Sequence, residues 1–237
     1  MEPVQERIPV LKYYGGAPML VLSLCFRTEK SSDTGKGVRM AGKNALFSWK
    51  LNEVVILVVL SIAIGVLFWA WTFIEALAKP LEAIGLRYLM SGVWFIGGTL
   101  VAFLIRRPGA ALLGEVLAAI LEGFITQWGI TAAIWGLVQG IGAEAAFALG
   151  RYKKWNLPMM LLAGFASALC SYILDFFYSQ YWTLQPWLWP VQIIAISVSG
   201  LFWAGWLAYH IGRGIIRTGV TSNLLSGDDL VKEESEE

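Results

Sequence analysis

Charged side chains are scarce in this sequence. Only 15% of the 237 residues are Asp, Glu, Lys or Arg, whereas 57% are hydrophobic. A soluble domain of this length needs far more charge on its surface, so the composition excludes that class of protein. The hydrophobic residues come in blocks long enough to cross a bilayer, which takes about 20 helical residues. The sequence therefore predicts a multi-pass protein of the cell membrane, in contact with lipid and without a nucleic-acid partner.

Histidine and cysteine are also rare. The one histidine, His210, lies far along the chain from Glu115 and Glu122, so these glutamates lack the further ligands that metal-dependent membrane hydrolases use. No serine or cysteine has a base nearby in the sequence. Cys25 and Cys170 fall in the N-terminal leader and in a predicted helix, so no disulfide is expected. We expect no enzyme activity, no catalytic residue, no metal site and no cofactor.

Long apolar blocks predict an all-α membrane protein, a bundle of six transmembrane helices. The predicted spans are Val54–Leu77, Leu89–Ile105, Ala110–Thr126, Thr131–Gly150, Leu157–Tyr178 and Pro190–Ile216. Only a short uncharged turn, residues 127–130, separates the third span from the fourth. The alternative for this pair is a re-entrant hairpin, which enters and leaves on one side of the membrane.

The basic residues indicate the orientation of the chain. With six spans, the loops alternate between two sides, and one side receives only Lys79 and Arg87. The other side receives Arg106, Arg107, Arg151, Lys153, Lys154, Arg213 and Arg217. Since the basic side is normally cytoplasmic, we expect both termini in the cytoplasm. We expect a partly disordered cytoplasmic leader at 1–48, the six-helix domain at 49–219 and a disordered acidic tail at 220–237.

Several acidic residues lie inside the predicted helices without a base at their level. Between positions 92 and 212 these acids are Glu115, Glu122, Glu144 and Asp175. The bases of that interval all lie at the cytoplasmic margin. A charge at the bilayer centre costs about 2.5–3.5 kcal/mol, so such residues face a cavity or bind a ligand. The imbalance predicts a cationic ligand or protonated carboxyl groups.

The acids differ in predicted depth. Counted from Pro108 at 1.5 Å per residue, Glu115 lies about 11 Å and Glu122 about 21 Å into the membrane, on nearly one helix face. Asp175 lies near the outer end of its helix, and Gln139 lies at mid-depth. We predict a ligand site formed by Glu122, Asp175 and Gln139, with Glu115 beneath.

Glu144 is predicted to lie nearer the cytoplasm, and two roles are open for it. It is included among the candidate ligand-binding residues because it is an acid within a helix. It is also within reach of Arg106, Arg107 or Arg151, with which it would form a structural salt bridge.

Aromatic residues gather at the predicted outer level. Tyr88 and Trp94 lie at the start of the second span, and Trp128 follows the third. The loop after Asp175 is rich in Trp and Tyr, has no charge and contains two prolines, which suits a lid over an outward-facing pocket. Most of these residues fit an interfacial aromatic belt, whereas one or two would stack on a flat or cationic ring.

Three motifs resemble a known family. The runs IRRPGAALLGEVLAAILEG, VQGIGAEAAF with RYKKW after it, and SYILDFF are similar to the YkoE family of substrate-binding (S) components of energy-coupling factor (ECF) vitamin transporters. The resemblance covers roughly residues 49–219. It implies a six-helix membrane bundle that captures thiamin or its hydroxymethylpyrimidine precursor (HMP) on the outer side.

The resemblance also implies partners. They are a transmembrane coupling (T) subunit and two ATPase subunits, and the chain has no GxxxxGK[ST] phosphate loop of its own. Ser61 and Gly65 are the nearest match to the small residues of the first helix through which S components dock. In this interpretation Glu122 or Asp175 faces the thiazolium, while Gln139 and Glu115 bind the pyrimidine edge. The alternative is a stand-alone proton-coupled carrier of organic cations, which needs no ATPase.

Overall fold

Every regular element in the described part of the chain is a helix. The structure is a computed structural model that describes residues 49–219, and the predicted leader and acidic tail lie outside the described residues. The elements are α1 (Leu51–Leu77), η2 (Lys79–Ile84), η3 (Leu86–Phe95), α2 (Ile96–Ile105), α3 (Ala110–Ile125), α4 (Thr131–Leu149), α5 (Leu157–Tyr178), η4 (Tyr181–Thr183), α6 (Leu188–Ser199), η5 (Gly200–Leu207) and α7 (Ala208–Arg217). The predicted all-α class is confirmed.

Five helical segments are long and apolar enough to cross a membrane. They are Leu51–Leu77, Leu86–Ile105, Thr131–Leu149, Leu157–Tyr178 and Leu188–Arg217. The remaining predicted span corresponds to α3, which has 16 residues and is about 24 Å long. That length is slightly less than the hydrocarbon core of a typical bilayer, about 30 Å.

Local sequence explains where the fifth segment begins. Asn156 precedes α5, and its side-chain oxygen accepts a hydrogen bond from the backbone N–H of Met159 at 3.3 Å. Pro158 lies in the first turn, where the missing N–H has no helical partner to lose. The helix therefore starts at Leu157, as the sequence predicts.

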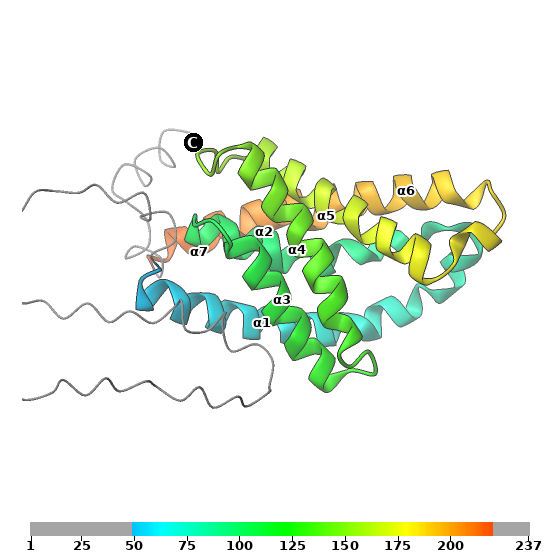
Figure 1. Cartoon of the computed structure of the whole chain (residues 1–237), viewed down its shortest axis with the longest axis horizontal. Coiled ribbons are helices and arrows are strands. Elements are labelled where there is room, and N and C mark those ends of the chain that lie inside the picture. Colours follow the sequence, from blue (N-terminus) through cyan, green and yellow to red (C-terminus); the bar gives the residue numbers. More distant parts are fainter. Residues whose placement is uncertain (1–48, 220–237) are drawn as a thin grey trace, which may run out of the picture. The chain divides into compact units, whose positions relative to one another are not determined.

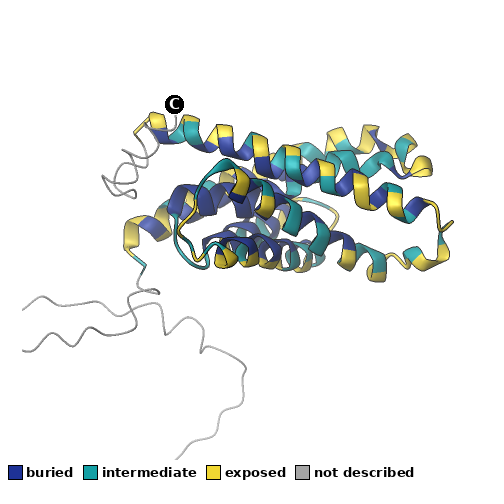
Figure 2. Ribbon diagram, turned by 90° about the horizontal axis from the view of Figure 1, so that it is seen from above, coloured by how far each residue is buried: buried dark blue, intermediate teal, exposed yellow. Residues whose placement is uncertain are grey.

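The helices turn apolar side chains outward. Along α1, for example, Val55, Val59, Ile62 and Val66 are exposed, and exposed positions run along the outer faces of the bundle (Figure 2). Exposing such an apolar surface to water would cost free energy, whereas contact with the apolar lipid tails would not. The predicted membrane environment follows from this surface.

The second segment lies at the centre of the bundle. Every residue of α2, Ile96–Ile105, is buried, and α2 contacts α1, α3, α4, α5 and α7. Glycines allow this close packing. A Cβ added to Gly97 would lie 2.8 Å from Glu115 Oε2, and one added to Gly114 would lie 2.7 Å from Val101 Cβ. The centre of the bundle thus depends on small residues on facing helices.

The second and sixth segments depart from α-helical winding where they meet. η3 is a 3-10 helix and η5 is a π-helix. Ser199 Oγ and Trp203 Nε1 both donate to the Leu89 carbonyl oxygen, at 2.8 and 3.1 Å, and the Gly92 N–H donates to Ser199 Oγ at 2.7 Å. Irregular winding frees backbone groups, which must find partners where no water is present. These hydrogen bonds provide the partners and fix η3.

The start of α1 and the end of α7 lie at the same end of the bundle (Figure 1). At that end Arg107, in the loop after α2, forms an ion pair with Glu53 of α1, with Nη2 and Oε1 2.8 Å apart. At the opposite end, the α5–α6 loop and η2 close the bundle.

Candidate ligand-binding site

A large cavity opens among the helices. It has a volume of about 710 Å³, which lies in the usual range for small-molecule sites, about 300–1,000 Å³. Its lining comes from α1, η2, η3, α3, α4, α5, η4 and α6. The predicted ligand residues that line it are Tyr88, Trp94, Glu122, Trp128, Gln139 and Asp175.

Glu122 presents a carboxylate to this cavity. Its side chain is 4% exposed, and Oε1 accepts a hydrogen bond from Trp94 Nε1 at 3.1 Å. Within residues 49–219 no hydrogen bond or ion pair reaches Oε2. An ionised carboxylate can accept about four hydrogen bonds, so Glu122 keeps most of its capacity for a ligand.

Asp175 is engaged by neighbouring side chains. Trp135 Nε1 donates to Oδ1 at 2.6 Å, and the Tyr88 hydroxyl donates to Oδ2 at 3.0 Å. The Tyr88 hydroxyl also lies 2.8 Å from that of Tyr181. Asp175 thus joins η3, α4 and the α5–α6 loop, and it orients the aromatic wall of the cavity.

Gln139 lines the cavity, and Glu115 lies behind it. When the Gln139 carboxamide oxygen faces Ser171 Oγ at 3.0 Å, its nitrogen lies 3.3 Å from Glu115 Oε1 and 3.2 Å from the Trp94 carbonyl oxygen. Glu115 is 1% exposed, does not line the cavity and accepts a hydrogen bond from the Gly98 N–H. Glu115 therefore stabilises the start of α2, where a helix has unpaired N–H groups and a positive dipole end.

Glu144 lies outside the cavity and caps α3. Oε1 accepts from the Gly109 N–H at 2.6 Å and from the Tyr152 hydroxyl at 2.7 Å, while Oε2 accepts from the N–H groups of Ala111 and Leu112 at 3.1 and 3.3 Å. The structure thus places Glu144 in a structural position. Its partners are backbone N–H groups and a hydroxyl, which spacing along the sequence does not reveal.

Glu75 is not among the four predicted acids, because it precedes the interval from position 92 to position 212. Glu75 Oε1 lies 3.0 Å from Arg87 Nε, and Glu82 Oε2 lies 3.1 Å from Arg87 Nη1. All three side chains line the cavity. An acid within the first apolar block was a signal that could have identified Glu75.

Trp135 was also missed, although its position carried a signal. It lies four residues before Gln139, so the two side chains share one face of α4 and both line the cavity. A tryptophan one turn from a polar residue in an apolar helix is a candidate wall residue for a polar ligand.

Ser61 and Gly65 lie inside the bundle. Ser61 is 1% exposed, and a Cβ added to Gly65 would lie 2.8 Å from the Ala118 carbonyl oxygen of α3. Docking of another subunit through these two residues would therefore require α1 to move away from α3.

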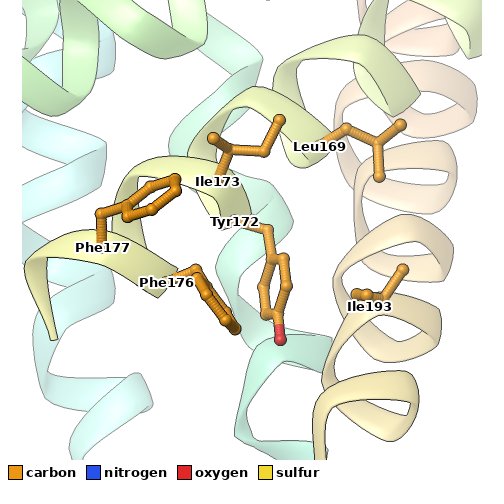
Figure 3. Close-up of a pocket in the computed structure, with 6 residues that line it drawn as sticks. All are labelled: Leu169, Tyr172, Ile173, Phe176, Phe177 and Ile193. Carbon is orange, nitrogen blue, oxygen red and sulfur yellow. The ribbon is translucent and has the colours of Figure 1, made fainter. Parts of the chain in front are cut away.

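A smaller hollow of about 230 Å³ lies between α5 and α6. Figure 3 shows the Tyr172 ring between Phe176 and Ile193, with Leu169, Ile173 and Phe177 around them. The Tyr172 hydroxyl donates to Gln192 Oε1 at 3.2 Å, and Gln192 lines the large cavity. The smaller hollow has no charged group to fix a polar ligand, so the large cavity is the candidate site.

The arrangement in the large cavity suits an organic cation better than a metal ion. Within residues 49–219 no three His, Cys, Asp or Glu side chains are placed to share one ion. The cavity offers separate carboxylates among aromatic rings, which attract a flat cation through charge and ring faces.

Comparisons with known proteins identify the family. The family described as "ABC-type cobalt transport system, permease component" matches residues 52–170. YkoE of Bacillus subtilis (strain 168), named provisionally as an HMP/thiamine permease, is 36% identical over 187 residues, which are 78% of this chain and 94% of YkoE. A solved structure described as an S-component of an ECF transporter has a TM-score of 0.73 and 33% identity, covering 80% of this chain and 96% of its own.

These similarities confirm the resemblance that the three sequence motifs indicate. They also confirm the membrane location and the absence of an enzymatic role, because the matching proteins are transporter components. The chain therefore belongs to the YkoE-like S-components of ECF transporters.

Proposed function

We propose that this chain captures thiamin or HMP on the outer side of the membrane for ATP-driven uptake. The observation that carries the proposal is Glu122, a buried carboxylate with one oxygen open to a cavity of about 710 Å³. A negative group of this kind would balance the charge of a thiazolium cation. No Lys or Arg of the described residues forms an ion pair with Glu122. The name of the YkoE relative supports the same ligand class.

The lining supports one pose for thiamin. Glu122 accepts the thiazolium charge, and Gln139, held by Ser171 and Glu115, binds the edge of the aminopyrimidine. The Trp94 ring is fixed through its N–H, so it is available for stacking without loss of rotamer freedom. HMP is neutral and uses the Gln139 end of the site alone.

The topology that we propose has six crossings, with α3 as the short third one and both termini in the cytoplasm. Two observations support it. The start of α1 and the end of α7 lie at one end of the bundle (Figure 1). The loops predicted at that end hold most of the basic residues that flank the spans, as the positive-inside rule requires.

The partners that we propose are a transmembrane coupling subunit and two ATPase subunits. Membership among ECF S-components supports them, and the sequence has no phosphate loop of its own. The coupling subunit would dock on the helices from within the membrane, and the ATPases would act from the cytoplasm.

Calorimetry of the purified chain tests the proposed ligand. We expect thiamin and HMP to bind, and we expect Co²⁺, the ion in the description of the matching family, not to bind. Absence of binding by both organic ligands, or saturable binding of Co²⁺ that excludes thiamin, would overturn the proposal. The free thiazole alcohol serves as a control for the contribution of one ring.

A further inference from the structure

One wall of the cavity carries a cluster of charges. Glu75 belongs to α1, Glu82 to η2 and Arg87 to η3, and all three line the cavity. Among its described lining residues Arg87 is the only Lys or Arg, whereas Glu75, Glu82, Glu122 and Asp175 are acids. Carboxylates therefore outnumber the single guanidinium.

Arg87 is already bound by two of these acids. Its Nε lies 3.0 Å from Glu75 Oε1, and its Nη1 lies 3.1 Å from Glu82 Oε2. Hydrogen bonds between ionised groups are stronger than neutral ones. The guanidinium keeps further N–H groups, but an anion that reached them would also meet both carboxylates at close range.

Three of the other donors on the cavity wall also serve carboxylates. The indole N–H of Trp94 donates to Glu122, and that of Trp135 donates to Asp175. The Tyr88 hydroxyl donates to Asp175 as well. A phosphate group needs donors for its oxygens, and these donors are occupied.

We infer that this site, given the proposed function, accepts thiamin and HMP only as free alcohols and excludes their phosphate esters. A phosphate monoester carries about −1.5 to −2 charges at neutral pH. In a cavity whose charged groups are four carboxylates and one guanidinium, the phosphate meets like charge without a free cationic receptor. The class of reaction that must supply the substrate is then a phosphatase reaction outside the cell, in which water takes the phosphoryl group and the alcohol is released.

The test compares thiamin with thiamin monophosphate by calorimetry on the purified wild-type chain. We expect the Kd of the monophosphate to be about 100-fold higher. In the double variant Glu75→Gln/Glu82→Gln, Arg87 loses both ionic partners and the cavity loses two negative charges. The Kd of the monophosphate should then be only about tenfold higher than that of thiamin. Glu53→Gln is the matched control, because Glu53 pairs with Arg107 and does not line the cavity.

The outcomes separate this inference from the proposed function. Equal affinity of the wild-type chain for thiamin and its monophosphate would overturn the inference and leave the proposed function intact. Failure of both thiamin and HMP to bind would overturn the proposed function, and the inference with it. If the folded double variant still bound the monophosphate about 100-fold more weakly than thiamin, the role of the charge cluster around Arg87 would be contradicted. The wild-type comparison decides the inference if that variant does not fold.

Discussion

At the scale of the residue, Glu122 is the side chain that we expect to bind the positive charge of the ligand. The variant Glu122→Gln keeps the shape of the side chain and an oxygen for Trp94 Nε1, but it removes the negative charge. We expect the Kd for thiamin to rise about 10- to 100-fold, because a hydrogen bond or contact to a charged group contributes about 1.5–3 kcal/mol. The Kd for neutral HMP should rise less than about threefold. Isothermal titration of both ligands measures the two values.

Glu144→Gln is the matched control for this measurement, because it makes the same chemical change outside the cavity. It should leave both affinities nearly unchanged. If Glu122→Gln weakened thiamin and HMP equally, the cation would not be bound at Glu122 and the proposed pose would be wrong.

The sequence alone does not distinguish Glu115 from Glu122. Both are glutamates of α3, seven residues apart and on nearly one face, and both are buried. The two glutamates differ in the groups that contact them from the neighbouring segments. Gly97 and Gly98 leave room for Glu115 to accept a hydrogen bond from the backbone N–H of Gly98. Glu122 instead accepts a hydrogen bond from the indole N–H of Trp94 and lines the cavity. Which buried acid is open to a ligand is decided by tertiary contacts, and these are absent from helix periodicity.

At the scale of the element, α3 is held at its N-terminus by Glu144 of α4. Gly109, the residue before α3, has φ 86° and no side chain to cap the helix, so the acceptor comes from the neighbouring helix. Glu115 of α3 in turn accepts the Gly98 N–H of α2. Each acid therefore ties the start of the preceding segment to its own helix, which fixes α2, α3 and α4 relative to one another.

We expect Glu144→Gln to lower the stability of the protein. The amide keeps one oxygen acceptor but loses the negative charge at the helix N-terminus, and such charges contribute about 0.3–2 kcal/mol. The thermal midpoint in detergent should fall, and ligand affinity should stay within about twofold of the wild type. Tyr152→Phe, which removes a single hydrogen bond to the same carboxylate, should have a smaller effect. A large loss of affinity in Glu144→Gln would contradict its placement outside the site.

Hydropathy predicts the helices well and their mutual arrangement poorly. The predicted bounds of α5 agree with the structure at both ends, and those of α3 and α4 differ by one residue at their C-terminal ends. Each segment that crosses the lipid must be apolar along its own length, so the sequence shows where such segments lie. The 3-10 winding of η3, the π-helix η5 and the central position of α2 depend instead on contacts such as those of Leu89 with Ser199 and Trp203. Such contacts join residues more than 100 positions apart, and one sequence does not reveal them.

At the scale of the whole molecule, capture and transport should be separable. Residues within 49–219 line a cavity of about 710 Å³, so the chain alone should bind thiamin. The sequence has no phosphate loop to hydrolyse ATP. In liposomes that contain the chain alone, we expect thiamin binding without accumulation, both with and without an inward proton gradient. Addition of the coupling subunit, the two ATPases and ATP should produce accumulation, measured as radiolabelled thiamin retained after filtration.

Proton coupling is the alternative that this experiment addresses, because buried carboxylates also serve as proton relays in carriers. A relay needs acids that pass a proton from one to the next across the membrane. Here Glu115 and Glu144 hold backbone N–H groups, and Asp175 holds an indole and a hydroxyl, so only Glu122 among the four predicted acids keeps an oxygen open to the cavity. Accumulation driven by the proton gradient alone would contradict the ECF mechanism for this chain. Its dependence on Glu122→Gln would then identify that carboxylate as the proton-binding group.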